Sequence, residues 1–355
     1  MAIDTEHPLL AEVIPDGVPS VEEHAVRRET IGISEPVLVD GTTHGLLTAA
    51  DPARKRKDLF MRGLVTAAFV VAMLPLVSLL FTVVRRGIDR VIHTGFFTSD
   101  QRGIFGGMPT DAAGNWIGFG GIMHAIAGTL TITLWATLIS VPIGMLTAIY
   151  LVEYGRGPLA RVVTFFVDVM TGIPSIVAGL FSFALFSIFF GPGVRLGIAA
   201  SVALSVLMIP VVVRSSEEML RLVPNELREA SYALGVSKWL TIVKVVLRTS
   251  VAGLTTSVLL AIARVIGETA PIMITAGVAD SLNLNPFSGR MMALPVFIYR
   301  QYQMGVVPCR PDQVNCVADI NFMRAWGAAL TLVVIIMALN GLGRLVTRLF
   351  APKLK

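Results

Sequence analysis

The apolar segment LLAIARVIGETAPIMITAG, residues 259–277, carries two residues of opposite charge, Arg264 and Glu268. Residues four apart on a helix share one face, so the two side chains are predicted to lie together. A guanidinium group can hold an oxyanion through two parallel hydrogen bonds, and a neighbouring carboxylate can compete with that anion. The pair could therefore bind an anion transiently, or it could be a structural ion pair that joins two helices.

The helix face that holds this pair is predicted to be a stripe of small and polar residues. Its other members are Ser257, Ala261, Pro271 and Thr275. A charge at the centre of a bilayer costs about 2.5–3.5 kcal/mol on insertion scales, so this face should meet the protein interior or a wet cavity. Because buried ion pairs are weak contributors to stability, the presence of both charges favours a function. We predict that Ser257, Arg264, Glu268 and Thr275 line a translocation pathway.

The composition of the chain indicates a membrane protein. Of its 355 residues, 54% are hydrophobic and only 15% are charged, whereas about 25% of residues are charged in soluble proteins. Six apolar runs reach the roughly 20 residues that a spanning helix needs. These runs cover about 60–83, 122–152, 162–190, 196–213, 249–278 and 325–346. They predict an all-α, polytopic bundle of six transmembrane helices, with kinks or breaks at Pro142, Pro174 and Pro271.

The segments between these runs differ in charge from one side of the bundle to the other. The segments 54–61, 153–161, 214–248 and 344–355 together hold sixteen Lys and Arg in 64 residues, whereas 84–121, 191–195 and 279–324 hold nine in 89. By the positive-inside rule the first four segments and both termini are predicted to be cytoplasmic. Residues 1–58 are predicted to be a disordered acidic arm that ends in a basic run, RKRK, which either fixes the topology or binds lipid. Residues 59–355 would then form the transmembrane domain.

The longest predicted cytoplasmic segment, residues 214–248, has helical periodicity. Leu227, Ala230 and Leu234 recur at helical spacing with charged residues between them. Gly235 can end this helix in a left-handed conformation, and a second helix can follow it. Ala230, Ser231 and Ala233 leave one face of this helix with little side-chain bulk. Such a face suits the groove of another protein, but the helix could equally rest on the membrane surface.

The stretch EASYALG at 229–235 resembles the EAA signature of ABC importer permeases. Glu229, Ala230, Gly235 and Val245 occupy its characteristic places, whereas the usual closing Leu-Pro is replaced by Leu247-Arg248. The resemblance implies a coupling helix that docks on an ATP-binding subunit. The residues it implies for this contact are Leu227, Glu229, Ala230, Ser231, Leu234 and Gly235.

Four longer stretches narrow the resemblance. They are IPVVVRSSEEMLRLVPNELREASYALG, TGIPSIVAGLF, ARVIGETAPIMITAG and MMALPVFIY. Together they resemble the phosphate-specific (Pst) importer permeases, and the GETAP and ALPVFIY forms favour the A-type over the C-type subunit. The resemblance implies a type I permease fold that moves phosphate by alternating access. It places Arg264 and Glu268 on the intramembrane motif of the family, and it matches Arg214 to another motif arginine.

The same resemblance implies the partners. These would be a second, C-type permease subunit as heterodimer, two copies of an ATP-binding subunit, an extracytoplasmic phosphate-binding protein and the lipid bilayer, with no nucleic acid. No Walker-type loop occurs in the sequence, so we expect no cofactor and no enzyme activity in this chain, with ATP bound by a partner. An intramembrane protease would need paired Asp residues, Ser with His, or an HExxH helix in the spans. Asp168 has no intramembrane Asp partner and HExxH is absent, so the sequence disfavours this class. A self-contained ion-coupled transporter has no ATPase to dock, so the EAA-like loop argues against that class. A related importer for molybdate or sulfate is the alternative.

Three further features leave alternatives open. Arg214 could help ions leave the pathway, or it could be a topology anchor. Asp168 is predicted to have a structural role, explained by a partner arginine or a helix terminus. Cys309 and Cys316 fall in a predicted external loop, where they could form a disulfide or remain free thiols. The histidines show no metal-ligand spacing, so no metal site is expected.

Overall fold

The computed structural model describes residues 52–350, apart from 94, 103, 105–117 and 312–315. Most of the predicted acidic arm therefore lies outside the described residues. The chain divides into two compact units, one ending at Leu74 and the other beginning at Pro75. Helix α3 (Pro52–Ile92) contains this boundary and begins with the basic run, so the boundary predicted after residue 58 falls inside a helix.

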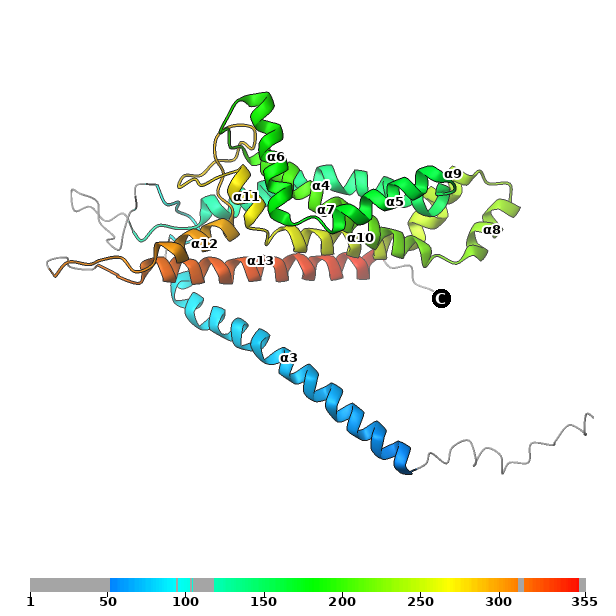
Figure 1. The fold of residues 1–355 in the computed structure, drawn as a ribbon, viewed down its shortest axis with the longest axis horizontal. Coiled ribbons are helices and arrows are strands. Elements are labelled where there is room, and N and C mark those ends of the chain that lie inside the picture. The colour runs from blue at the N-terminus through cyan, green and yellow to red at the C-terminus, as the bar shows by residue number, and fades with distance from the viewer. Residues whose placement is uncertain (1–51, 94, 103, 105–117, 312–315, 351–355) are drawn as a thin grey trace, which may run out of the picture. The chain divides into compact units, whose positions relative to one another are not determined.

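Every regular element in the described residues is helical (Figure 1). After α3 the helices are α4 (Met123–Ile149), α5 (Pro158–Thr171), α6 (Ser175–Phe190), α7 (Gly197–Arg221), α8 (Asn225–Ala233), α9 (Lys238–Thr241), α10 (Leu247–Val265), α11 (Ala270–Thr275), α12 (Leu294–Met304) and α13 (Ile320–Phe350). Two π-helical turns complete the set. The first, η1 (Tyr150–Tyr154), continues α4, and the second, η2 (Ile242–Val246), joins α9 to α10.

Five helical segments among the described residues are long and apolar enough to cross a bilayer. They are Lys55–Ile92, Met123–Tyr154, Gly197–Arg221, Lys238–Val265 and Ile320–Arg348. A sixth span results if α5 and α6 count as one, because they form a pair bent by 106°. The bend falls at Gly172–Pro174, where the sequence predicts a break, and Pro174 holds an extended conformation there with φ −58° and ψ 136°.

The fifth span differs from its prediction. We expected a span over 249–278 with a kink or break at Pro271, but the helix begins at Lys238 and ends at Val265, and only the short α11 follows. Pro271 lies in the first turn of α11, where its missing N–H costs nothing. Inside a continuous helix the same proline would remove a backbone hydrogen bond, so the helix stops before it. The predicted second helix of the loop is thus the beginning of this span.

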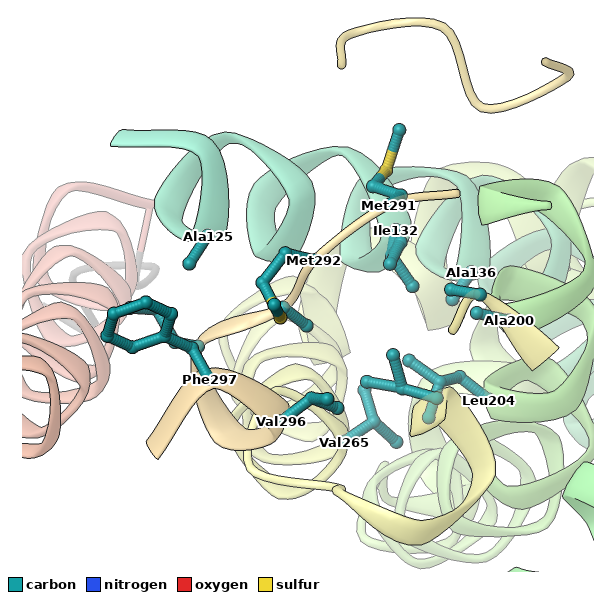
Figure 2. Packing of buried hydrophobic residues seen from close by; sticks show 14 of the residues in the cluster. Ala125, Ile132, Ala136, Ala200, Leu204, Val265, Met291, Met292, Val296 and Phe297 are labelled. Carbon is teal, nitrogen blue, oxygen red and sulfur yellow. The ribbon is translucent and has the colours of Figure 1, made fainter. Parts of the chain in front are cut away.

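The main core lies in the second unit, where α4, α7 and α10 meet the segment that leads into α12. Ile132, Leu204, Val265 and Phe297 are among its members (Figure 2). The helices approach closely through small residues, and Ser201 on α7 donates a hydrogen bond of 3.0 Å to the Ile132 carbonyl on α4. The remaining buried small residues of α7 include Ala199, Ala200, Ala203 and Ser205. Small, polar interfaces of this kind are typical of helices packed inside a membrane.

Large apolar side chains of the second unit point outward. On α6, Ile188 and Phe189 are 79% and 74% exposed. In water such a surface would promote aggregation, but in a bilayer it is solvated by lipid chains. The burial pattern therefore agrees with the membrane assignment made from composition.

Candidate functional site

In the structure Arg264 and Glu268 do not lie on one continuous helix. Arg264 is the penultimate residue of α10, and Glu268 lies in the break before α11. The Glu268 amide donates to the Val265 carbonyl at 3.1 Å, which closes a turn at the helix end. The expectation that the two side chains share one helix face is therefore wrong, because the helix ends between them.

In the isolated subunit Arg264 is exposed and Glu268 is half-buried. Neither forms an ion pair or a side-chain hydrogen bond with any residue that the structure describes. The two charges are thus not a structural ion pair within this chain. A free guanidinium group in the apolar part of a span must face water, a ligand or another polypeptide.

The rest of the predicted polar stripe packs inside the bundle. Ser257 is 4% exposed, and Ala261 and Thr275 are fully buried. The Thr275 hydroxyl donates to the Pro271 carbonyl at 2.6 Å, so it satisfies its own helix. Ser257 and Thr275 therefore do not share a surface with Arg264, and the stripe divides into a packed part and an exposed arginine.

The break after Arg264 is held in place by α6. A Cβ atom at Gly179 would lie only 2.7 Å from the Pro271 Cα, so the two backbones touch at this glycine. Such close approach is possible only without a side chain. The position of α11, and with it the break, thus depends on contact with the second half of the bent pair.

Arg214 lies on α7, which continues beyond it to Arg221. Its guanidinium group pairs with Asp168 of α5 and, at 2.9 Å, with Glu217. Glu217, whose side chain is 8% exposed, also binds Arg221 at 2.6 Å. Asp168 thus has the arginine partner that the sequence analysis considered. These contacts tie α5 to α7, and a role for Arg214 in translocation stays a prediction.

Helix α8 covers the centre of the predicted coupling segment. It begins after Pro224 and ends before Gly235, whose φ of +76° is the left-handed conformation expected from the sequence. Leu227 is 41% exposed and Leu234 83% exposed. Glu229, Ala230 and Gly235 are exposed as well. α8 therefore presents a largely open surface with an apolar component.

Ser231 is the exception among the predicted coupling residues. It is 7% exposed, and its hydroxyl shares a hydrogen bond of 2.8 Å with Thr241. Thr241 is the last residue of α9, so this bond joins α8 to the start of the fifth span. Ser231 therefore faces the bundle rather than the surface open to a partner.

Sequence reasoning missed the ion pair that anchors α8. Arg228 donates to Glu153 at 3.0 and 3.1 Å, and the two side chains are 12% and 5% exposed. Arg228 also donates to the carbonyls of Leu220 and Val223, at 3.0 and 2.6 Å. Lys238 adds a hydrogen bond of 2.5 Å to the Glu153 carbonyl. α8 is thereby tied to the ends of α4 and α7 and to the start of α9.

Glu153 occupies the π-helical turn η1, and the other π-turn, η2, packs against α8. π-turns are rare and frequently occur at functional sites. Arg228 is one of the charged residues between the apolar positions of α8, and Glu153 lies 75 residues away in the sequence. No local pattern connects them, so only the fold could reveal the pair.

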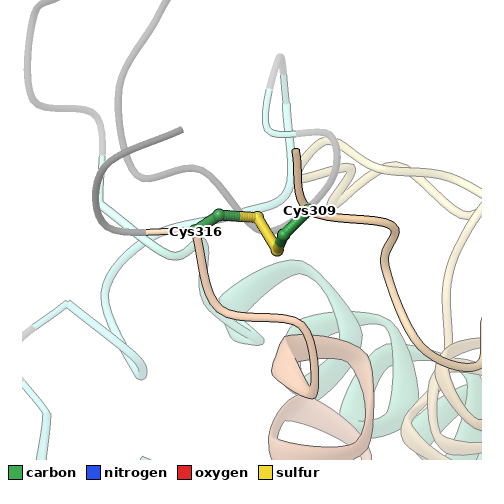
Figure 3. The surroundings of a disulfide bond; sticks show 2 residues. All are labelled: Cys309 and Cys316. Carbon is green, nitrogen blue, oxygen red and sulfur yellow. A yellow bond between two sulfur atoms is a disulfide. The ribbon is translucent and has the colours of Figure 1, made fainter. Parts of the chain in front are cut away.

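Cys309 and Cys316 form a disulfide bond in the connection between α12 and α13 (Figure 3). Their Cα atoms are 5.9 Å apart. The bond closes a short loop that includes residues 312–315, which lie outside the described residues. Of the two alternatives from the sequence, the structure has the disulfide.

The described residues thus combine spanning helices packed through small residues, a broken span with an exposed arginine, and the exposed helix α8. This combination is consistent with a membrane permease. The family model described as binding-protein-dependent transport system inner membrane component matches residues 140–355. This match covers more than half of the chain, so the chain belongs to that family. It is a multi-pass membrane protein and a transport component, not itself an enzyme.

Phosphate transport permeases are similar to most of this chain. A phosphate transport system permease protein, PstA 1, of Mycobacterium tuberculosis is 46% identical over 273 residues, 77% of this chain and 83% of the relative. The PstA permease of Yersinia pestis is 35% identical over 308 residues, 84% and 92% of the two chains. The resemblance to phosphate-specific importer permeases is thereby confirmed. Inward-facing structures of the methionine ABC transporter MetNI are similar, with a TM-score of 0.47 and 21% identity, covering 64% of this chain and 94% of theirs.

Proposed function

We propose that this chain is the permease subunit of an ATP-driven importer that translocates inorganic phosphate by alternating access. The identity to phosphate permeases extends over most of both chains, which supports phosphate over the alternative anions molybdate and sulfate. The single observation that carries the proposal is the exposed, unpaired guanidinium group of Arg264 at a break in a span.

Arg264 has the chemistry that such an importer needs. Phosphate is an anion with several acceptor oxygens, and a guanidinium group can bind it through two hydrogen bonds at once. A permanent tight site would trap the ion, so a competitor is useful. Glu268 lies one turn away in the break, and its carboxylate is not engaged by other described residues. We propose that phosphate displaces this carboxylate on entry and loses the guanidinium to it on exit.

The exposure of Arg264 suggests that the pathway is completed by another subunit. In the assembled importer a charge at this depth should be shielded from lipid. A second permease subunit of the C-type, packed against this surface as a heterodimer, would enclose it. Ser257 and Thr275, which are buried here, would then support the pathway from within the bundle, and Arg214 would fix the positions of α5 and α7.

The exposed surface of α8 is the proposed contact with an ATP-binding subunit. Its apolar residues, Leu227 and Leu234, would be buried there, and Glu229, Ala230 and Gly235 would lie beside them. Two such ATPase copies would bind and hydrolyse ATP, so this chain needs no cofactor of its own. An extracytoplasmic phosphate-binding protein would deliver the ion at the opposite end. In this arrangement α8 and both termini are cytoplasmic.

The test is uptake by the complete importer in reconstituted vesicles. Arg264→Ala should abolish phosphate uptake while subunit assembly and ATP binding persist, because only the anion contact is removed. Arg248→Ala is the matched control, since Arg248 is an exposed arginine on the same helix, and its uptake should stay near wild type. Full uptake by the Arg264 variant would sink the proposal, and equal transport of sulfate by the wild type would refute phosphate specificity.

A further inference from the structure

Two adjoining hollows lie in the second unit, around the end of α12 and the start of α13. One has a volume of about 820 Å³ and is lined by α3, α12 and the start of α13. The other has a volume of about 570 Å³ and is lined by α11, α12 and α13. Both are bordered by Tyr302 and Trp326, so they adjoin at these two side chains, and the two hollows together are called the groove. Each volume is in the range of small-molecule sites.

The first hollow is charged. It contains Arg85, Arg86 and Asp89 of α3 and Asp319, which directly precedes α13, and all four are exposed. Arg86 lies over the Trp326 ring, 5.5 Å from its centre. None of the four has an ion-pair partner in the described part of the chain. Two guanidinium groups and two carboxylates in one concavity complement a ligand with both an anionic and a cationic group.

The second hollow is apolar. Its lining includes the apolar side chains of Ala270, Met273, Ile298, Ala325 and Ala329. It extends from Trp326 to Thr269, beside the break that carries Glu268. A groove with a charged end and an apolar end fits an amphiphile.

A close helix contact builds the wall between α3 and α13. A Cβ atom at Gly87 would lie 2.7 Å from the Trp326 carbonyl oxygen, so the two helices touch there. Arg85 and Arg86 directly follow the apolar part of α3. Tyr302 and Trp326 border both hollows, and aromatic rings of this kind are enriched where the apolar layer meets the headgroups. The charged end therefore lies at the depth of lipid headgroups.

We propose that the groove binds one phospholipid with a primary-amine headgroup. Its phosphate lies between Arg85 and Arg86, its ammonium group lies between Asp89 and Asp319, and one acyl chain follows the apolar hollow to α11. A helix of another subunit is a poorer occupant, because it would bury four charges that then need partners. The bound acyl chain contacts Ala270 and Met273 of α11.

Lipid that remains bound to the purified complete importer tests this site. Mass spectrometry of extracted lipid should find phosphatidylethanolamine retained by the wild type. The Arg85→Gln/Arg86→Gln variant should retain at least about tenfold less, since each charge-assisted contact contributes about that factor or more. Ala329→Phe, which fills the apolar hollow and leaves all charges, should also lower retention. Arg195→Gln/Arg290→Gln changes two exposed arginines outside the groove and should have no effect.

Headgroup preference tests the charge argument. In nanodiscs of mixed composition, phosphatidylethanolamine should be enriched at the groove over phosphatidylcholine, whose trimethylated nitrogen donates no hydrogen bond, and over phosphatidylglycerol, which has no cation. Equal retention of all three would overturn the proposal. So would a photoreactive residue at Tyr302 that crosslinks to a protein subunit and not to lipid. Unchanged retention in the arginine double variant would overturn it as well.

Discussion

At the scale of single residues, the important property of Arg264 and Glu268 is that their charges are not engaged in an ion pair with each other in this chain. Helix α10 ends between them. A carboxylate that competes weakly for a guanidinium group would let an anion bind and leave. A carboxylate that only positioned the arginine would be expected to hold it in a fixed ion pair.

Replacing Glu268 with Gln distinguishes these two roles. If the carboxylate competes with phosphate, Glu268→Gln should bind phosphate more tightly and transport it more slowly at saturating concentration, with KM and kcat both lowered. Glu218→Gln on α7 is a control for the loss of one exposed carboxylate that has no ion-pair partner in the described residues. Phosphate affinity that falls together with the rate would instead assign Glu268 to positioning Arg264.

At the scale of helices, the break in the fifth span depends on one glycine. The contact between Gly179 and Pro271 fixes α11 against α6, and Pro271 prevents α10 from continuing. The charged residues lie at this junction. A small change in the packing of α6 should therefore change the position of Arg264.

Gly179→Ala should destabilise the subunit by about 1–3 kcal/mol, the usual cost of an extra methyl group in a close contact. The new Cβ would lie 2.7 Å from the Pro271 Cα, so one backbone must shift. Thermal unfolding of the purified importer and phosphate uptake should both report the change. Gly341→Ala is the matched control, because a Cβ there meets nothing within 4 Å, and it should be neutral or slightly stabilising. Equal behaviour of the two variants would rule out the contact as the cause.

At the scale of the whole molecule, the ion pair between Arg228 and Glu153 connects the exposed helix to the spans. It joins α8 to the end of α4, and the further hydrogen bonds of Arg228 reach the end of α7. Removing one partner of a buried pair leaves an uncompensated charge and costs about 3–5 kcal/mol. The exposed side chains of α8 would stay unchanged in such a variant. Docking of the ATP-binding subunit can therefore be separated from the transmission of α8 movement to the spans.

Arg228→Ala should uncouple the importer. We expect ATP hydrolysis by the assembled complex to continue while phosphate uptake per ATP falls about tenfold or more, because movement of α8 is no longer transmitted to α4. Arg156→Ala is the matched control, since Arg156 lines the same hollow of about 640 Å³ but has no ion-pair partner in the described residues. If uptake and hydrolysis fell in proportion, the pair would contribute to docking rather than transmission.

Features that depend on local pattern were predictable from the sequence. The apolar runs, the break at Pro174, the left-handed Gly235 and the exposed helix before it all follow from the chemistry of a few neighbouring residues. The family motifs are likewise short stretches of sequence, and the comparisons confirm the family that they predict. The membrane class followed from composition and apolar run length alone, because runs of about 20 apolar residues with few charges are long enough to span the hydrocarbon core of a bilayer.

Features that depend on distant contacts were decided by the tertiary structure. The helix after Arg264 ends where α6 and Pro271 meet, so Glu268 left the face that periodicity assigned to it. Ser257 and Thr275 became packing residues because other helices cover them. Glu153 and Arg228 lie 75 positions apart, and only the packing of α4, α7 and α8 brings them together. Periodicity specifies which residues share a face of a regular helix, but burial, helix ends and ion pairs are set by the neighbours that the fold supplies.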